Sequence, residues 1–303
     1  MKTELEKGKP TPRPDWLKVR LPRGERYFQL KGLVKDQKLN TVCEDARCPN
    51  IGECWGAGTA TFMILGDVCT RSCKFCAVKT GLPPEYDTDE PRRVAQAIKS
   101  LDLKYAVITS VDRDDLDDGG AFIFAETIRL TRAACPAIRI EVLIPDFRGN
   151  APSLGTVVTA RPNVLAHNVE TVPRLYPVAR AGSRYPRSLE LLRNVKSLDA
   201  AMSTKSSVML GLGERRDEVL EVLNDLREAE VDILTLGQYL QPSRENLPVD
   251  RFYAPQEFSD LREYATSLGF RHVEAGPLVR SSYHAEKQAH ILRRPAVIVL
   301  TAR

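Results

Sequence analysis

Short apolar runs alternate with amphipathic segments along most of this chain. Apolar runs with strand character predict strands at Thr61–Leu65, Tyr105–Thr109, Ile138–Ile144, Val164–Ala166, Ser206–Leu210, Ile233–Leu236 and His272–Ala275. Apolar residues at helical spacing, with Glu, Lys and Arg on the opposite face, predict helices at Pro91–Ser100, Ala121–Ala134, Arg187–Leu198, Asp217–Ala229 and Gln256–Leu268. Alternating strands and helices predict βα units around a parallel sheet. We therefore expect an α/β fold, a partial (β/α)6-type barrel with its site at the C-terminal strand ends.

The same pattern divides the chain into three parts. Residues 1–58 hold an amphipathic stretch around Tyr27–Asp36 but too few apolar residues for a core of their own, which predicts an extension lying over a larger unit. Residues 59–276 form the predicted barrel, and residues 277–303 form a C-terminal extension. The apolar run Ala296–Leu300 in that extension predicts an added strand or packing element.

Composition and charge narrow the possible partners. A chain of 303 residues with 43% hydrophobic content can bury a full core. The formal charge is only +4, with basic residues scattered among acidic ones, whereas binding nucleic acid usually requires a clustered basic face. No apolar run approaches the ~20 residues of a membrane span, and the charged start of the chain lacks the apolar segment of a secretory signal. We expect a cytoplasmic protein without nucleic-acid or membrane partners.

The cysteines carry the strongest chemical signal. Six of the seven form two close-spaced triplets: Cys43, Cys48 and Cys54, then Cys69, Cys73 and Cys76. Three thiolates from one loop can bind three irons of a 4Fe-4S cluster and leave the fourth iron open to a different ligand. Structural zinc usually takes four ligands in paired arms, and disulfides need an oxidising compartment, so both alternatives fit the triplets less well. Two triplets therefore predict two four-iron clusters.

The second triplet identifies a superfamily. It reads C-T-R-S-C-K-F-C and follows the first predicted barrel strand directly. This spacing at this position resembles the radical S-adenosylmethionine (radical SAM) superfamily. The resemblance implies that S-adenosyl-L-methionine chelates the open iron and that an electron from the cluster cleaves it to methionine and a 5′-deoxyadenosyl radical, with the protein orienting the cofactor.

Two further strand ends are candidates for contacts with adenosylmethionine. Gly119 and Gly120 follow the second predicted strand, where the superfamily binds the methionine ammonium group; the alternative is an ordinary glycine turn. Asn168 and Glu170 follow the fourth strand and could bind the ribose or adenine, or could instead cap the next helix.

The first triplet resembles one family within that superfamily. The segment T-V-C-E-D-A-R-C-P-N-I-G-E-C-W is similar to the auxiliary-cluster motif of lipoyl synthases. Further similar segments are A-T-F-M-I-L-G-D-V-C-T-R-S-C-K-F-C, V-L-I-P-D-F, L-A-H-N-V-E-T-V, G-L-G-E and R-S-S-Y-H-A, so that the resemblance covers about residues 30 to 290. It implies that Ser282, the second serine of R-S-S-Y, is the fourth ligand of the auxiliary cluster. An alkoxide is a harder ligand than a thiolate and should leave iron more easily. Arg280 is a candidate for holding the auxiliary loop or a passing carboxylate. Taken alone, R-S-S-Y is also typical of a helix start with a serine cap.

The resemblance implies a function. A lipoyl synthase inserts two sulfur atoms, at C6 and C8 of a protein-bound octanoyl-lysine, and takes the sulfur from its auxiliary cluster. The implied partners are an octanoylated lipoyl-domain carrier protein, a low-potential electron donor of the ferredoxin or flavodoxin type, and iron–sulfur assembly proteins. Two alternatives remain: another sulfur-inserting radical enzyme of the methylthiotransferase type, which would need an RNA-binding module that the sequence does not show, and a non-catalytic iron–sulfur carrier.

Overall fold

The computed structural model describes residues 13–19, 22, 24–46 and 48–291. Within this part of the chain, one curved eight-stranded sheet has the order β1-β2-β5-β6-β7-β8-β9-β10. Its strands are β1 (Asn40–Thr41), β2 (Thr59–Ile64), β5 (Tyr105–Ser110), β6 (Arg139–Leu143), β7 (Val164–Ala166), β8 (Ser203–Leu210), β9 (Ile233–Gln238) and β10 (His272–Gly276). Strands β2 to β10 pair in parallel, and only β1 is antiparallel to its neighbour. Every predicted strand is present, and the partial barrel is confirmed.

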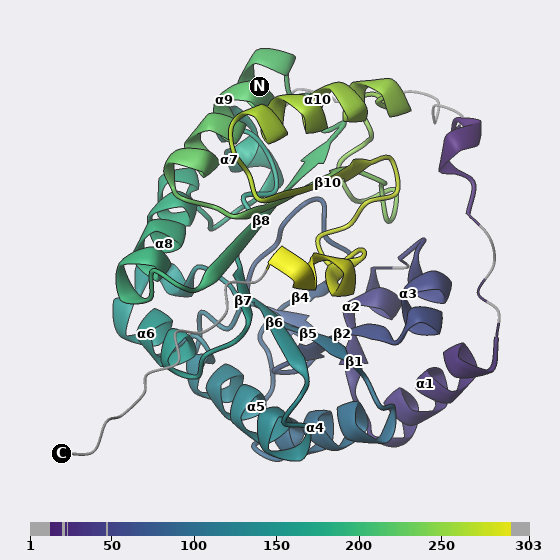
Figure 1. Cartoon of the computed structure of the whole chain (residues 1–303), viewed down its shortest axis with the longest axis vertical. Helices are drawn as coiled ribbons and strands as arrows, with labels where there is room; N and C mark the ends of the chain where they lie inside the picture. The colour runs from purple at the N-terminus through teal and green to yellow at the C-terminus, as the bar shows by residue number, and fades with distance from the viewer. Residues whose placement is uncertain (1–12, 20–21, 23, 47, 292–303) are drawn as a thin grey trace.

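The helices lie in an arc outside the sheet (Figure 1). The predicted ones are confirmed as α4 (Glu90–Ser100), α5 (Ala121–Ala134), α8 (Tyr185–Leu198), α9 (Arg216–Glu228) and α10 (Pro255–Ser267). Two helices of the barrel were not predicted, α6 (Ala151–Thr159) and the short α7 (Tyr176–Ala179). The sequence of α6 contains a glycine and several β-branched residues, which are poor helix formers. Its start is stabilised because the Asn150 side chain accepts a hydrogen bond from Ser153 N.

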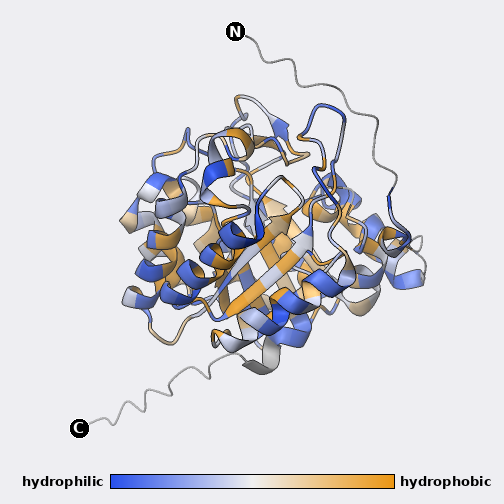
Figure 2. Cartoon of the chain, turned by 90° about the horizontal axis from the view of Figure 1, so that it is seen from above, coloured by the Kyte–Doolittle hydropathy of each residue, from blue (hydrophilic) through white to orange (hydrophobic). Residues whose placement is uncertain are grey.

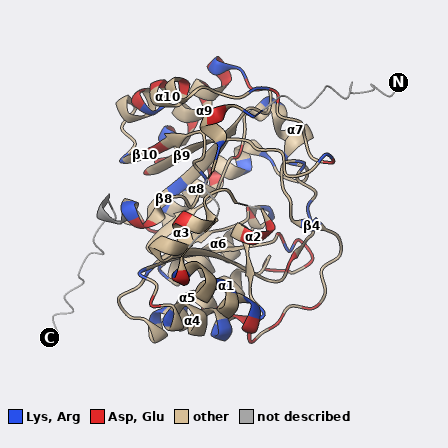
Figure 3. Ribbon diagram, turned by 90° about the vertical axis from the view of Figure 1, so that its right-hand side faces the viewer, with Lys and Arg blue, Asp and Glu red and all other residues tan. Residues whose placement is uncertain are grey.

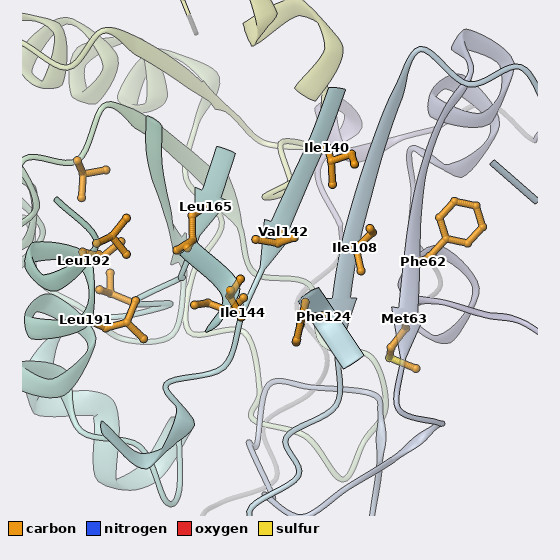
Figure 4. Packing of buried hydrophobic residues seen from close by; sticks show 14 of the residues in the cluster. Phe62, Met63, Ile108, Phe124, Ile140, Val142, Ile144, Leu165, Leu191 and Leu192 are labelled. Atoms are coloured by element: carbon orange, nitrogen blue, oxygen red, sulfur yellow. The ribbon is translucent and has the colours of Figure 1, made fainter. Parts of the chain in front are cut away.

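The core lies between the sheet and the surrounding helices. Phe62, Ile108 and Val142 of the strands pack in one buried cluster with Phe124 of α5 and Leu192 of α8 (Figure 4). Apolar strands occupy the centre, while the helices carry polar residues outward (Figure 2). Burial on both faces explains why the strands read as short continuous apolar runs rather than as alternating ones. Among the described residues, no helix combines the length and apolarity needed to cross a bilayer.

The N-terminal part joins this core instead of forming its own. Leu30 and Val34 of α1 (Glu25–Asp36) are buried in the main cluster. The ring of Tyr27 lies 5.3 Å from that of Trp55, which belongs to α3 (Ile51–Ala57). The strand β1 then extends the sheet beside β2. The boundaries proposed for the three parts of the chain stay a prediction.

The C-terminal part lies against the start of two barrel strands. The 3-10 helix η4 (Ala285–Ile291) lies inside the arc of helices, and Ala285 packs against Tyr105 and Val107 of β5. Thr59 at the start of β2 donates a hydrogen bond to Glu286 (2.9 Å). The apolar run Ala296–Leu300 lies outside the described residues.

The left-handed backbone at Gly120, just before α5, leads to a testable prediction. Its φ is +86°, and an added Cβ would clash with Leu65 Cδ1. We expect Gly120→Ala to lower the free energy of unfolding by roughly 1–3 kcal/mol, because a left-handed non-glycine residue is strained and the clash adds to it. The control is Gly32→Ala in α1, where nothing lies within 4 Å of the added Cβ and alanine is the better helix former. Equal melting temperatures for the two variants would contradict the predicted strain at Gly120.

Candidate iron–sulfur sites

The first cysteine triplet surrounds a pocket. Cys43 lies in the helix α2 (Val42–Asp45), Cys54 lies in α3, and Cys48 lies on the turn between them. The turn is tight because Cys48 N donates to Cys43 O (2.9 Å). The residues that line the pocket are Cys43, Cys48, Asn50, Ile51, Cys54, Thr59, Thr61, Arg280, Ser282 and Tyr283. The three thiols therefore face one cavity together with the residues expected from the R-S-S-Y segment.

Side-chain contacts fix the R-S-S-Y segment over this pocket. Thr61 of β2 donates a hydrogen bond to Ser282 Oγ (3.0 Å), and Asn50 Nδ2 donates to Leu278 O (2.6 Å). The Tyr283 hydroxyl donates to Glu53 in α3 (3.1 Å). Ser282 thus contacts a strand of the barrel through its hydroxyl, and the hydrogen bond found for it is not that of a helix cap.

Arg280 brings a positive charge to the same pocket. One guanidinium nitrogen donates to the carbonyl oxygens of Gln238 (3.0 Å) and Val279 (2.9 Å). Within the described part of the chain, Arg280 forms no ion pair with a carboxylate, although burial lowers its pKa and the charge of Cys48 acts in the opposite direction. A half-buried cation with only carbonyl partners is favourable where it faces negative charge. The pocket therefore suits an anionic occupant.

The second triplet lies at the C-terminal end of the barrel strands, as predicted. Cys69 ends the short strand β3 (Val68–Cys69), which follows β2, and Cys73 and Cys76 lie before β4 (Lys79–Thr80). Cys69 Sγ accepts hydrogen bonds from Arg71 N (3.4 Å) and Asp112 N (3.3 Å). Cys76 Sγ accepts one from Val78 N (3.5 Å). Backbone N–H groups directed at sulfur stabilise thiolates and tune cluster potentials, so this loop suits an iron–sulfur cluster.

The cysteine thiols can be compared with the two alternatives to iron–sulfur clusters, which are disulfide bonds and a zinc site. All seven cysteines are free, so the structure forms no disulfide among them. Nowhere in the described residues do three or more His, Cys, Asp or Glu side chains converge in a way that could hold a single metal ion. Burial raises the pKa of Cys43 and Cys69 to about 11 and that of Cys73 to about 12, so metal binding at these thiols must displace protons. The three thiols of the first triplet line one pocket, an arrangement that suits an iron–sulfur cluster.

Arg71, inside the second triplet, ties this loop to the neighbouring strand ends. Its side chain is buried and forms ion pairs with Asp112 (3.3 Å), Asp114 (2.8 Å) and Asp146 (2.6 Å). Burial alone would raise the pKa of Asp146, but the hydrogen bonds and charge of Arg71 lower it to about 2. The network connects the cysteine loop with the ends of β5 and β6.

The segment after β9 holds the same loop from another side. Asn246 Nδ2 donates to the carbonyl oxygens of Cys76 (2.8 Å) and Lys74 (3.1 Å). Leu247 N also donates to Lys74 O (2.9 Å), and Lys74 N donates to Ala179 O in α7 (2.9 Å). These four hydrogen bonds therefore hold the backbone of the loop in place.

The two pairs of residues predicted to contact adenosylmethionine have different surroundings. Gly119 and Gly120 have positive φ and pack closely: an added Cβ at Gly119 would lie 2.9 Å from Phe147 Cδ1. Close packing explains both glycines without a ligand, and their contact with adenosylmethionine stays a prediction. Asn168 Nδ2 donates to Glu170 Oε1 (3.0 Å), and the next helical turn, η3 (Pro173–Leu175), has no side-chain cap.

The surroundings of Asn168 contain groups that the sequence did not reveal. Asn168 Oδ1 is buried and has no hydrogen-bond partner among the residues that the structure describes. Burial raises the pKa of Glu170, and the charge of Arg180 opposes this. Arg180 donates to Asn168 O (2.8 Å), and its positive charge opposes the rise that burial causes in the pKa of Cys73. An orphaned acceptor, a carboxyl group and a guanidinium thus lie beside the second triplet, where a polar ligand could bind.

Sequence reasoning missed Arg180, Asp112, Asn246 and Thr61. Asp112 stood in the acidic run after β5, but the glycines downstream were singled out instead. Arg180 and Asn246 stand in segments without a recognisable pattern, and nothing local marks their approach to the cysteines.

Comparisons with known proteins agree with this geometry. Residues 63–226 match the radical SAM superfamily, and residues 1–48 match the N-terminal domain of lipoyl synthase of that family. A protein of Koribacter versatilis named lipoyl synthase is 54% identical over 296 residues, which is 98% of this chain and 97% of that protein. Another of that name, from Rubrobacter xylanophilus, is 56% identical over 285 residues, 94% of this chain and 89% of that protein.

The fold also matches a solved structure. That of methylornithine synthase superposes with a TM-score of 0.53 at 14% identity, and the match covers 82% of this chain and 81% of the other. At this identity the likeness concerns the fold alone.

Proposed function

The chain belongs to the lipoyl synthase family of radical SAM enzymes, and on that premise we propose which residues carry each half of the reaction. It is a radical SAM sulfurtransferase that makes the lipoyl group. Each cysteine triplet has its own function, and neighbouring side chains position the substrates.

The second triplet, Cys69, Cys73 and Cys76, binds the cluster that reacts with adenosylmethionine. Bound there, the cluster and adenosylmethionine would supply the 5′-deoxyadenosyl radical that removes hydrogen from the octanoyl chain. Asn168, Glu170 and Arg180 bind polar groups of adenosylmethionine: the free Oδ1 of Asn168 accepts, and Arg180 offers a cation to a carboxylate. Gly119 and Gly120 shape the strand end behind this site.

The first triplet and Ser282 hold a second 4Fe-4S cluster, which is the sulfur-donating substrate. The observation that carries this assignment is the single pocket lined by Cys43, Cys48, Cys54 and Ser282. Arg280 balances the negative charge of the occupant. Thr61 donates a hydrogen bond to the Ser282 oxygen, which steadies that ligand while it is bound and leaves it exchangeable.

The substrates and partners follow from the reaction. The acceptor is an octanoyl-lysine on a lipoyl-domain protein, sulfurated at C6 and then at C8. Each cleavage of adenosylmethionine consumes one electron, so a low-potential ferredoxin or flavodoxin is required. Iron–sulfur assembly proteins restore the consumed cluster. We place these events in the cytoplasm.

Reconstitution under anaerobic conditions tests the proposal. Protein rebuilt with iron and sulfide should hold about eight irons, the content of two four-iron clusters. With dithionite, adenosylmethionine and an octanoyl-lysyl peptide, mass spectrometry should find the dithiolated peptide and two equivalents of 5′-deoxyadenosine. A carrier would form no 5′-deoxyadenosine, and a methylthiotransferase would leave the octanoyl peptide unchanged. Either result would refute the proposal.

A further inference from the structure

We propose that the outer face of the second cysteine loop is the docking surface for an acidic electron-transfer protein. The donor face is defined by three basic residues, Lys74, Arg184 and Arg244. The inference rests on the proposed function, because it assumes that the cluster of this loop receives electrons one at a time. In each transfer the donor loses one electron and the cluster gains one, and no bond or proton moves.

The loop is exposed on one side only. Ser72, Lys74 and Ala77 are exposed to solvent, whereas Cys73 and Cys76 between them are half-buried. On the inner side lie the strand ends, with Asn168 and Arg180 of the proposed adenosylmethionine site. A protein donor needs an exposed surface to contact, and the outer side of the loop offers one.

Backbone contacts gather the three basic residues around the tip of the loop. Lys74 N donates to Ala179 O at the end of α7, and Arg184 follows shortly after Ala179. Lys74 O accepts from Leu247 N and from Asn246 Nδ2, and Arg244 lies just before Asn246. Helix α7 and strand β4 lie on the same side of the molecule (Figure 3). Two segments distant in sequence, each with an exposed arginine, thus contact the backbone of Lys74.

These cations are not neutralised by the protein itself. Lys74, Arg184 and Arg244 are exposed, and no ion pair joins any of them to a carboxylate in the described residues. Neighbouring cations are paired: Lys79 with Asp67 (2.6 Å) and Arg187 with Asp146 (3.2 Å).

One acidic residue, Glu245, is exposed beside Arg244, and together with the three cations it gives these four residues a net positive charge. Complementary charge on a partner mainly raises the association rate and fixes its orientation. An acidic donor, which must bind briefly and leave, is the partner that such a surface fits.

The test compares two reductants on the same holoenzyme. The variant Arg184→Glu/Arg244→Glu is reconstituted, and 5′-deoxyadenosine formation is driven either by reduced flavodoxin at low concentration or by dithionite. We expect the flavodoxin-driven rate at low salt to fall at least about tenfold, within the range of electrostatic steering. The dithionite-driven rate should stay within about twofold of the wild type. The wild-type flavodoxin rate should also decrease as salt is added.

The control is Lys99→Glu, an exposed lysine in the last turn of α4 at the other end of the barrel, which should leave both rates unchanged. An unaltered flavodoxin rate in the double variant would overturn the proposal. So would an equal loss with both reductants, or a raised KM for the octanoylated carrier alone, because these would assign the face to loop stability or to the carrier. If the wild type formed no 5′-deoxyadenosine even with dithionite, the proposed function itself would fail.

Discussion

Single alanine substitutions in the two cysteine triplets are expected to divide the reaction into its halves. Cys73→Ala should abolish 5′-deoxyadenosine formation, because the cluster that binds adenosylmethionine loses one of its three thiolate ligands. Cys48→Ala should still form 5′-deoxyadenosine but give no sulfurated peptide, because only the sulfur-donating site is lost. In each variant the iron content should fall from about eight to about four per chain. Liquid chromatography of the nucleoside and mass spectrometry of the peptide separate these outcomes.

The matched control is Cys135→Ala. This cysteine ends α5, away from both triplets in the sequence, and its thiol should contribute nothing to either cluster. The Cys135→Ala variant should hold about eight irons and form both 5′-deoxyadenosine and the sulfurated peptide. Cys73→Ala with undiminished 5′-deoxyadenosine, or Cys48→Ala with normal sulfur insertion, would show that the triplets do not divide the work in this way.

Arg71→Met is expected to cause a large loss of stability. Removing the guanidinium leaves Asp146, whose side chain is fully buried, with only Arg187, and leaves Asp112 and Asp114 without their shared cation. Breaking a buried ion pair from one side typically costs about 3–5 kcal/mol. Because Arg71 lies between Cys69 and Cys73, the variant should also incorporate less iron at the second site. Thermal or denaturant unfolding of anaerobically purified protein measures the first effect, and iron analysis the second.

A surface ion pair provides the comparison. Arg129 pairs with Glu126 on the exposed side of α5, and Arg129→Met should change the free energy of unfolding by no more than about 1 kcal/mol. Arg71→Lys should lie between the two, since it keeps the charge but loses the planar fork that contacts several carboxylates. If Arg71→Met were as stable as Arg129→Met, the three aspartates would not depend on Arg71.

The sequence by itself determined the local order of this protein. Apolar periodicity predicted the strands and the longer helices because hydrogen bonding and burial within one segment depend on that segment's own residues. The helix α6 escaped prediction because its residues have poor intrinsic propensity, and packing against the sheet outweighs that preference. The spacing within each triplet was also informative, because three thiols on one short loop can reach a common ligand in almost any fold.

Only the tertiary structure decided what faces each triplet. Ser282 and Arg280 meet Cys48 because the C-terminal segment crosses the open side of the barrel, and family resemblance alone, not local pattern, had suggested this. Arg180 and Asn246 approach the second triplet from the ends of other strands. In a parallel sheet, residues far apart in sequence become neighbours through strand order, which no local spacing records. The side chains that surround each cysteine loop therefore depend on the topology, while the loops that carry the cysteines can be recognised from the sequence.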